Sequence, residues 1–503
     1  MRLLAAAVAA LVLPLAAEAK GFPLGVAAGE VTSTSAVLWT RAGGPGAVTL
    51  EVSRDPRFRG TPVARIRLVA SRSRDFTVQR RISALKPGTR YRYRFRQGRL
   101  ASPIGSFRTA PAPSSAETIR FAFTGDADGE RDPRTRRPAY NAFGVYARMA
   151  TEGNHFNVNL GDTIYSDSEI GGLPAALTVR QKWAKYRRNL EYTALRRLRG
   201  SAALYSHWDD HEFVNDFSVP EHGASLYAAG AQAFRDYSPV RWNADDGLYR
   251  RVRWGRHLEL FFLDERSFRS AKASQACDGD LAPTAPQPVR DAFASIAPAL
   301  ARPVPQSCLD AIADPARTML GPRQYAEFTR AIAASTATWK VVVNEVPIQQ
   351  LYALPYDRWE GYAAERRRLL EFLRANVRNV LFLTTDAHAN WINEVRLQTL
   401  EPGGPVGTGI WEVVTGPVAT NTYSREIDER LGNAGAGTTV EALFFKPAPP
   451  RGLGMACSAA DVYSYAEVRV TAATITVTPK DSAGRQVREK LGTPCGPLVL
   501  RAS

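Results

Sequence analysis

Cysteine is scarce in this sequence, and its scarcity narrows the possible kinds of site. The 503 residues include four cysteines, none in a Cys-x-x-Cys arrangement, which argues against a zinc-thiolate site and a redox dithiol. Beyond the first 19 residues, no segment is long and apolar enough to cross a bilayer. The sequence also lacks a long low-complexity tract, an internal repeat and a nucleic-acid-binding motif. These shortages argue against membrane-embedded, repeat and disordered proteins.

The composition is that of a folded globular protein. Hydrophobic residues make up 45% of the chain and charged residues 23%, which supplies a substantial core. A chain of 503 residues is too long for one ordinary core, so we expect a large domain and at least one smaller module. The net charge of +16 would concentrate phosphate-bearing substrates, but the arginines are scattered, which favours a solvated basic surface.

Residues 1–19 have the pattern of a signal peptide. One charge at Arg2 precedes an apolar run from Leu3 to Ala16, and Ala17-Glu18-Ala19 fits a cleavage site. The apolar run is shorter than the roughly 20 residues of a spanning helix, which disfavours a retained membrane anchor. We therefore expect a secreted or periplasmic chain that begins near Lys20 and has no transmembrane segment.

The four cysteines suit an oxidising compartment because their number is even. Their order suggests the pairs Cys277–Cys308 and Cys457–Cys495, although spacing alone does not prove a pairing. The sequence leaves the oligomeric state open.

Residues 20–110 have the pattern of an all-β module. Between Val26 and about Thr109, short runs alternate apolar and polar residues and are separated by Gly, Pro and Ser, as in a β-sandwich. The segment 85–93 resembles the turn and strand of fibronectin-type modules. A linker over 110–116 follows. The expected strands are 35–40, 48–52, 63–69, 76–82 and 91–96.

Residues 117–503 have the pattern of an α/β domain. Buried strands each end in a polar cluster, and helices lie between them. Ligand sites in such folds lie beyond the carboxyl ends of strands. The expected strands are 119–123, 157–160, 204–207, 258–263, 340–343 and 380–383. The expected helices are 139–151, 179–199, 225–237, 322–334 and 363–377.

Four polar clusters directly follow apolar runs. They are Gly125-Asp126-Ala127-Asp128, Gly161-Asp162-Thr163-Ile164-Tyr165, Asp209-Asp210-His211-Glu212 and Thr385-Asp386-Ala387-His388. Any one of them could be a turn, since Asp and Gly favour turn geometry, but four in order are hard to explain in that way. Crowded carboxylates repel one another unless cations neutralise them. We therefore expect a metal site, and two metals could clamp a phosphoryl group and generate a hydroxide nucleophile.

The order and spacing of the clusters resemble the calcineurin-like metallophosphoesterase superfamily, specifically the PhoD-type alkaline phosphatase family. The resemblance covers nearly the whole mature chain. It also rests on Gly21–Gly29 with Val37–Arg41, on Trp208–Glu212 with Asn215, and on Tyr356–Tyr362. It implies an α/β fold with a metallophosphoesterase-type β-sandwich core flanked by helices, preceded by the all-β fibronectin-like module.

The resemblance further implies two metal ions that share Asp162 as a bridge. The ligands of the first metal would be Asp126, Asp162, Tyr165 and His388. The ligands of the second would be Asp162, Asp210, Asp386 and, in addition, Asn344. Asp128 stands where the family commonly has a Cys or His ligand. The implied catalytic residues are Asp162 and His211, and His211 would protonate the leaving oxygen or stabilise developing charge.

Tyrosinate is a hard anionic ligand, so the resemblance implies ferric iron (Fe3+) with Ca2+ as its partner, or another divalent ion such as Mn2+ or Zn2+. The chain departs from the family at Asp128, at Glu345, where Gln is usual, and in a signal peptide without twin arginines. The last departure suggests export of an unfolded chain that acquires its metals outside the cytoplasm.

The expected function is hydrolysis of phosphate monoesters, diesters or both through a metal-bound hydroxide. A phospholipase D-like or nucleic-acid phosphodiesterase is the rival, because PhoD-type relatives include diesterases and the basic balance favours polyanions. The non-enzymatic alternative is an extracellular binding protein whose α/β domain has lost activity. The sequence disfavours this alternative because every cluster keeps a side chain that can bind a metal.

Overall fold

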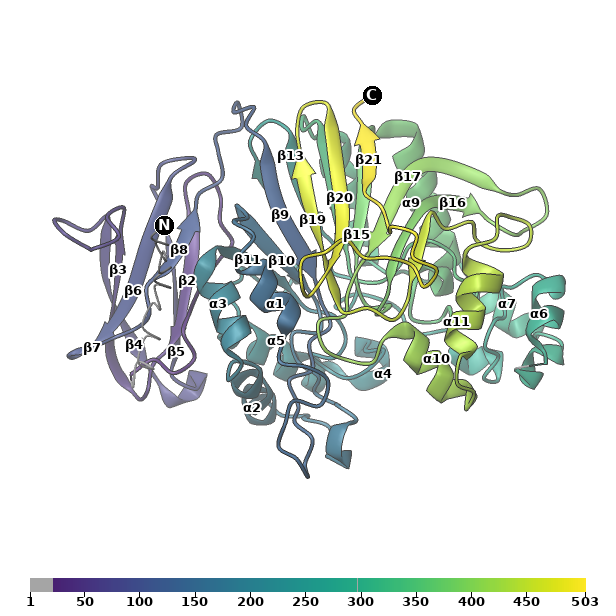
Figure 1. The fold of residues 1–503 in the computed structure, drawn as a ribbon, viewed down its shortest axis with the longest axis horizontal. Coiled ribbons are helices and arrows are strands. Elements are labelled where there is room, and N and C mark those ends of the chain that lie inside the picture. The colour runs from purple at the N-terminus through teal and green to yellow at the C-terminus, as the bar shows by residue number, and fades with distance from the viewer. Residues whose placement is uncertain (1–20, 296) are drawn as a thin grey trace, which may run out of the picture.

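Two large β-sheets face each other at the centre of the molecule (Figure 1). The computed structural model describes residues 21–295 and 297–503, so the expected signal peptide, residues 1–19, lies outside the described residues. In the described part, the first sheet has nine strands in the order β21 (Leu498–Arg501), β20 (Thr474–Asp481), β19 (Ser464–Val470), β9 (Ile119–Thr124), β10 (Phe156–Leu160), β11 (Ala203–His207), β1 (Val26–Gly29), β2 (Ala36–Arg41) and β5 (Thr77–Ile82). The second sheet has seven strands in the order β12 (Arg250–Trp254), β13 (Leu258–Phe262), β14 (Trp339–Asn344), β15 (Val380–Thr384), β17 (Val406–Val414), β16 (Asn390–Gln398) and β18 (Cys457–Ala459).

Apolar residues on both faces of the central strands explain why the two sheets are buried between helices. In β15, Leu381 and Leu383 enter the core between the sheets. Val380 and Phe382, on the alternate positions, enter a second core under the helices of the outer face. Successive side chains of a strand point to opposite faces, so a continuous apolar strand is covered on both. The expected β-sandwich core flanked by helices is confirmed.

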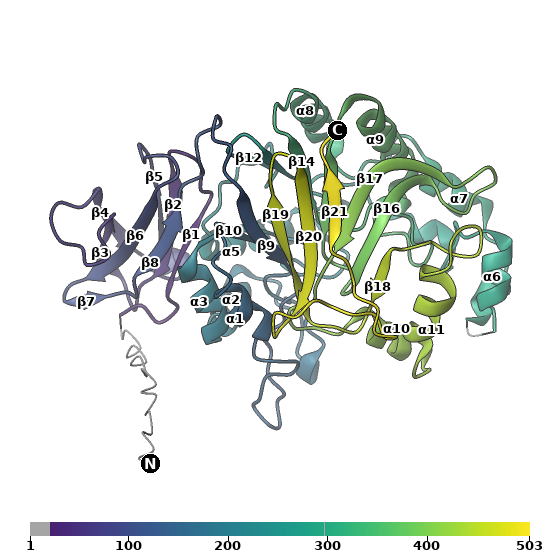
Figure 2. The same ribbon diagram turned by 45° about the horizontal axis from the view of Figure 1, so that its top comes forward.

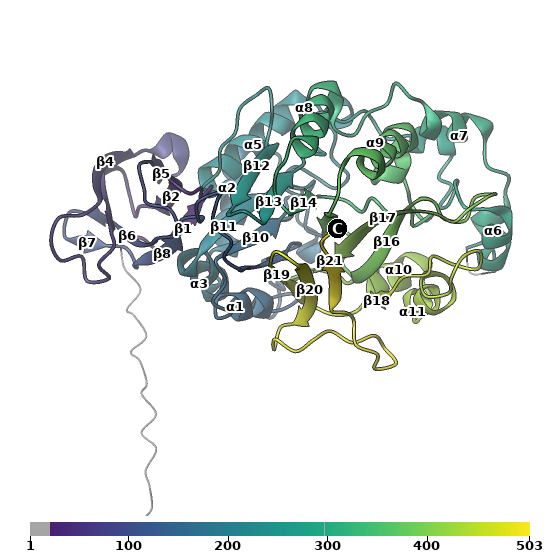
Figure 3. The ribbon, with the colours of Figure 1, turned by 90° about the horizontal axis from the view of Figure 1, so that it is seen from above.

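Helices cover the outer face of each sheet. On the seven-stranded sheet, Phe328 of α8 and Leu369 of α9 pack in one core with Phe382. On the nine-stranded sheet, Trp183 of α2 and Phe234 of α5 lie in another core. Figure 3 shows α8 and α9 on one side of the sheets and α1 and α3 on the other. The α-helices are α1 (Gly144–Met149), α2 (Val179–Asn189), α3 (Thr193–Ser201), α4 (Val219–His222), α5 (Ala224–Tyr237), α6 (Gln287–Phe293), α7 (Gln306–Ala313), α8 (Gly321–Ala333), α9 (Ala363–Asn376), α10 (Tyr423–Leu431) and α11 (Ala436–Val440).

The N-terminal strands form a two-layered β-region at one end of the molecule (Figure 2). One layer contains β4 (Ala64–Ala70), β3 (Gly46–Ser53), β6 (Arg90–Gln97), β7 (Leu100–Ala101) and β8 (Gly105–Arg108). The other layer contains β1, β2 and β5. It is continuous with the nine-stranded sheet, because β1 pairs in parallel with β11 through Ala28 and Ala203. The shared sheet ties this region to the α/β core, and a domain boundary at 110–116 stays a prediction.

The helix expected over 179–199 is two helices, α2 and α3. Asn189 ends α2, and its side-chain amide donates to the carbonyl oxygens of Ala127 and Thr163, each at 2.8 Å. These carbonyls belong to the loops after β9 and β10, so the break in the helix holds two loops of the site. The helix expected over 139–151 is only α1, because Asn141 Oδ1 accepts from the backbone N–H of Phe143 at 2.8 Å and forms a turn there.

Both suggested cystine pairs are present, Cys277–Cys308 and Cys457–Cys495. The first joins η3 (Ser274–Cys277) to α7 and closes the segment inserted between β13 and β14. Across residues 21–295 and 297–503, no helix combines the length and apolarity needed to cross a membrane.

Candidate metal centre and active site

The acidic clusters lie together at the carboxyl ends of parallel strands. Asp126 follows β9, Asp162 follows β10 and Asp210 follows β11, which are neighbours in one sheet. Asp386 follows β15 in the facing sheet. The N–H of Ala127 donates to the carbonyl oxygen of Asp162 at 2.9 Å, and the N–H of Asp386 donates to Asp126 Oδ1 at 3.3 Å. Loops from both sheets therefore meet at one place.

Four site residues adopt left-handed backbone conformations. The φ angles are 65° at Asp126, 47° at Asp162, 64° at Asp386 and 51° at His388. Such conformations cost on the order of 1–3 kcal/mol each in residues with a Cβ, and they gather at functional sites. Gly416 makes room for one of them, since a Cβ on this glycine would lie 2.5 Å from Asp126 Oδ2. Backbone strain thus accompanies the convergence of the acidic side chains.

Atoms able to bind a metal form overlapping groups, within each of which all atoms lie within 4.8 Å of one another. The groups are Asp126, Asp162 and His388; Asp162, Asp210 and His211; Asp209, Asp210 and Asp386; and Asp210, Asp216 and Asp357. Asp162 belongs to the first two groups, and Asp210 belongs to the last three. Neighbouring cations that share a carboxylate require such an overlap.

Tyr165 and His388 lie together on the Asp126 side of the site. The Tyr165 hydroxyl is 3.1 Å from His388 Nε2, and Glu426 Oε1 of α10 is 2.6 Å from His388 Nδ1. A carboxylate on one ring nitrogen orients the imidazole and leaves the other nitrogen for a ligand. Burial and the carboxylates of Asp162 and Asp126 raise the pKa of Tyr165 well above its ordinary value. The phenol would therefore ionise only against a strong cation.

His211 is paired with an aspartate that holds its ring. Asp167 Oδ1 is 2.6 Å from His211 Nδ1, and the ring stacks on Tyr165 with 4.1 Å between centroids. Burial opposes the charged imidazolium, but Asp162, Asp210 and Asp167 outweigh it and raise the pKa of His211 well above its ordinary value. The contact with Asp167 at Nδ1 fixes the ring and leaves Nε2 for a substrate.

Arg266 is a buried arginine among the acids. Its Nε is 2.5 Å from Asp209 Oδ1, and its Nη1 is 2.8 Å from Asp357 Oδ2. Its Nη2 lies 3.8 Å from Asp386 Oδ1 and 3.9 Å from Asp210 Oδ1, and has no hydrogen-bond partner within the described chain. Burial disfavours its charge, but the surrounding carboxylates raise the pKa of Arg266 well above its ordinary value. The arginine neutralises only part of the acidic charge.

The excess of acid fits bound cations. The site opens into a pocket of about 740 Å³ that is lined by ten Asp and Glu residues and two arginines. Among the described residues, Asp126 Oδ2 and Asp210 Oδ1 are buried without a hydrogen-bond partner. Burial raises the pKa of Asp126 to about 7 and that of Asp162 well above its ordinary value. Buried carboxylates of this kind ionise when a cation compensates them, and oxygen-rich sets with imidazole suit hard metal ions.

Asp128 lies outside these groups, and Asn344, like Tyr165, is not a residue type that the groups include. Asp128 lines the pocket, but its Oδ1 accepts from the N–H of Glu130 at 2.9 Å and its Oδ2 accepts from Ser168 Oγ at 2.5 Å. Asn344 lies at the end of β14, where its Nδ2 donates to a backbone carbonyl two residues on and its Oδ1 accepts from Trp359 Nε1 at 3.1 Å. Protein partners engage both side chains, and their roles as metal ligands stay predictions.

The sequence pattern did not predict roles for Asp167, Arg266 or Glu426. Arg266 belongs to a polar cluster that follows β13, so the rule that selected the acidic clusters could have found it. Asp167 stands two residues after Tyr165, which is a weak signal. Glu426 lies on a helix 38 residues after its partner His388, and no local pattern marks it.

Comparison with protein families gives two matches. A family model described as PhoD-like phosphatase matches residues 136–448, more than half of the chain. A second model, described as PhoD-like phosphatase, N-terminal domain, matches residues 7–111. The two models together span the β-region and most of the α/β core.

Individual proteins are also similar. Alkaline phosphatase D of Bacillus subtilis (strain 168) is 28% identical over 429 residues, covering 75% of this chain and 66% of that protein, slightly under two thirds of its length. A structure of PhoD has a TM-score of 0.72 at 23% identity and covers 96% of this chain and 95% of its own. A purple acid phosphatase from yellow lupin (Lupinus luteus) seeds has a TM-score of 0.57 at 11% identity, covering 92% of this chain and 72% of its own. At these identities the two structures show a shared fold.

Proposed function

The chain belongs to the PhoD-like phosphatase family, which indicates a phosphoric ester hydrolase, and from this premise we propose that it hydrolyses phosphate monoesters, diesters or both in a metal-dependent reaction. One observation carries the proposal. Carboxylates from the loops of two facing sheets form overlapping groups whose ligand atoms lie within 4.8 Å of one another, and buried oxygens of Asp126 and Asp210 have no hydrogen-bond partner in the described chain. Two adjacent metal ions are the usual means of catalysing phosphoryl transfer at such a site.

We assign the proposed metals to the residues that the geometry brings together. The first metal would be held by Asp126, Asp162, Tyr165 and His388. The second would be held by Asp162, Asp210 and Asp386, with Asn344 as a further proposed ligand. Asp128 is a proposed ligand that we assign to neither metal. We propose Fe3+ with Ca2+, or with another divalent ion such as Mn2+ or Zn2+. Bound ions would supply Lewis acidity toward the phosphoryl oxygens.

The chain's own residues supply the proton chemistry. Hydrolysis adds the oxygen of water to phosphorus, and the bond between phosphorus and the leaving oxygen breaks. We assign His211 to give its Nε2 proton to that leaving oxygen, while Asp167 holds Nδ1 and keeps the ring in place. Glu426 would orient His388 in the same way.

A substrate panel tests the reaction. We expect that removing metals with a chelator abolishes hydrolysis and that adding Fe3+ with Ca2+, Mn2+ or Zn2+ restores it. The panel contains an aryl phosphate, an aryl phosphodiester, phosphatidylcholine and single-stranded DNA. A strong preference for monoesters would dispose of the phospholipase D-like and nucleic-acid phosphodiesterase alternatives. No hydrolysis of any ester with any of these ions would favour an extracellular binding protein instead.

Tyr165 supplies a spectroscopic prediction. If its phenolate binds Fe3+, the metal-loaded protein should absorb visible light, and Tyr165→Phe should lose that band.

Tyr93 provides the matched control for the colour test, because it is a buried tyrosine of β6 in the N-terminal β-region, away from the acidic loops. Tyr93→Phe should keep the band. An active, metal-loaded protein that is colourless and contains no iron would show that the assignment of the first metal is wrong. Phosphoesterase activity with other ions could still stand.

We also propose that the protein is exported, secreted or periplasmic. Two disulfides support this, since such bonds persist in oxidising compartments. Fractionation of the producing cells, with detection of a mature chain that begins near Lys20, would test it.

A further inference from the structure

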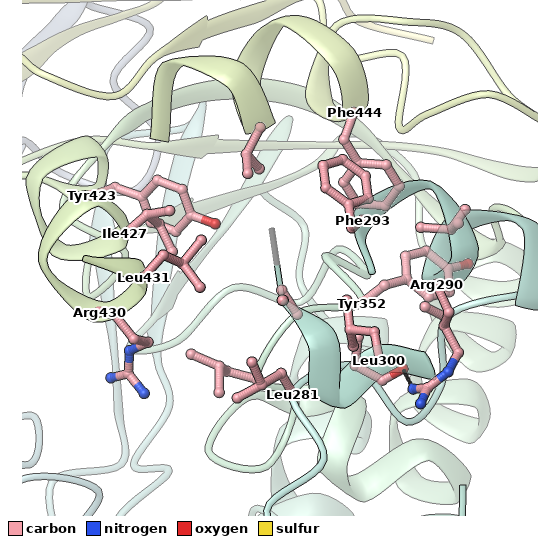
Figure 4. Close-up of a pocket in the computed structure, with 17 residues that line it drawn as sticks. Leu281, Arg290, Phe293, Leu300, Tyr352, Tyr423, Ile427, Arg430, Leu431 and Phe444 are labelled. Atoms are coloured by element: carbon pink, nitrogen blue, oxygen red, sulfur yellow. Dashed lines mark hydrogen bonds between the residues drawn. The ribbon is translucent and has the colours of Figure 1, made fainter. Parts of the chain in front are cut away.

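The metal site opens into the pocket of about 740 Å³ described above, which we call the ionic pocket. An apolar cavity of about 100 Å³ adjoins it (Figure 4). Leu281, Phe293 and Leu300 approach it from the segment between β13 and β14, and Phe444 packs beside Phe293, with 5.7 Å between ring centroids. Figure 4 shows these side chains around a common space, with Ile427 and Leu431 facing them. We call this space the side cavity.

Helix α10 forms a wall shared by the side cavity and the ionic pocket. Tyr423, Ile427 and Leu431 are spaced four residues apart, so they form one stripe of the helix, and all three line the side cavity. Tyr423, Ile427, Arg430 and Leu354 line both spaces. Glu426, on the same helix, binds the imidazole of the proposed metal ligand His388. A ligand bound in the ionic pocket would therefore be separated from the side cavity only by residues of α10 and Leu354 that line both spaces.

Two polar side chains in the rest of the cavity wall form hydrogen bonds with other residues of the protein. Arg290 binds Asp280 through both terminal nitrogens, each at 2.8 Å. The hydroxyl of Tyr352 donates to Glu401 at 3.0 Å and accepts from the N–H of Leu400 at 2.9 Å. The side cavity therefore offers an apolar surface to a ligand. Arg430, which is exposed and has no ion pair within the described chain, stands where the two spaces meet.

We propose that the side cavity binds the hydrocarbon group of the phosphate ester, so that the substrates are esters carrying an aromatic ring or a short alkyl chain beside the phosphoryl group. This rests on the proposed function, because the phosphoryl group must occupy the ionic pocket. A cavity of this size holds roughly one ring or about four carbons. Burial of apolar atoms supplies the affinity, and Arg430 supplies a charge toward the anionic oxygens.

Binding of alkylphosphonates, which cannot be hydrolysed, tests the proposal without turnover. Calorimetry on the metal-loaded protein would compare methyl-, propyl-, butyl- and hexylphosphonate. We expect affinity to rise by up to roughly 4-fold for each buried methylene and to level off near butyl. Leu431→Asn should bring butylphosphonate close to the affinity of methylphosphonate, while methylphosphonate itself binds as before.

Leu443→Asn is the matched control, since Leu443 is 62% exposed and does not line the side cavity. In this variant, phosphonate affinity should still rise with chain length as in the unmodified protein. Ala285→Phe fills the cavity from another side, and it provides a second test if Leu431→Asn fails to fold. This variant should also remove the dependence of phosphonate affinity on chain length. Affinity that does not depend on chain length, absence of phosphonate binding, or a dependence that persists in both cavity variants would overturn the proposal.

Turnover of the corresponding esters separates this proposal from the proposed function. Alkyl phosphates and symmetrical dialkyl phosphates from methyl to hexyl would be compared by release of phosphate or alcohol. A rise in kcat/KM that parallels the phosphonate affinities supports both proposals. If phosphonates bind as expected but neither ester series is hydrolysed, the proposed function fails and the side cavity stands.

Discussion

Replacement of Asp162 by alanine is expected to empty the metal centre and to reduce activity close to background. Asp162 is the carboxylate shared by the group around Asp126 and His388 and the group around Asp210 and His211. Its loss would remove one ligand from each proposed metal. Metal affinity should therefore fall by more than the roughly 10- to 100-fold that substitutions of outer partners cost.

Metal content measured by elemental analysis, together with turnover and visible absorbance, checks this result. Asp162→Asn keeps the shape of the side chain and should also lose metal, which separates loss of charge from a packing defect. Asp236→Asn is a control, because Asp236 is buried outside the metal groups. Full metal occupancy in Asp162→Ala would overturn the bridging assignment.

The pH dependence of metal binding follows from the same acids. Burial raises the pKa of Asp126 to about 7, and only the ionised carboxylate binds a metal. Protons therefore compete with the metal below pH 7, and metal affinity should rise as pH increases toward and through this value. The metal centre should therefore be fully occupied only above about pH 7.

His211→Ala should keep its metals but lose roughly 10²- to 10⁴-fold in rate, the usual range for one positioned acid-base group. The loss should be large for an alkyl ester, whose leaving oxygen needs a proton, and smaller for a nitrophenyl ester. Metal analysis and turnover with both esters measure the difference. Near-wild-type turnover on both would remove His211 from the mechanism.

Asp167→Asn distinguishes a positioning role from a merely structural one. Asp167 is among the groups that raise the pKa of His211, so its neutralisation should lower that pKa. An acid is lost as pH rises through its pKa, and the alkaline limb of the rate profile should therefore move to lower pH in this variant. An unchanged profile would mean that Asp167 does not act through His211.

The elements of the core could be predicted from sequence because their signals are local. Apolar runs and their alternation placed a strand at 380–383, and the structure has β15 at Val380–Thr384. The acids after these runs could be predicted to gather, since parallel strands carry their carboxyl ends to one edge. Asp126, Asp162, Asp210 and Asp386 do meet there. The helix break at Asn189 could not be predicted, because its cause is a contact with loops far away in the chain.

By itself, the sequence determined the strands, the acids that end them, the cysteine order and the family resemblance, since these are properties of neighbouring residues. The tertiary structure alone decided which side chains complete the site. Glu426 reaches His388 only because the start of α10 packs on the loop after β15, where the N–H of Tyr423 donates to the carbonyl oxygen of His388. Arg266 reaches Asp209 only because the two sheets face each other. The same docking of α10 placed the side cavity against the ionic pocket. Such contacts depend on how loops and helices pack across the sheets, and no local period of the chain encodes that packing.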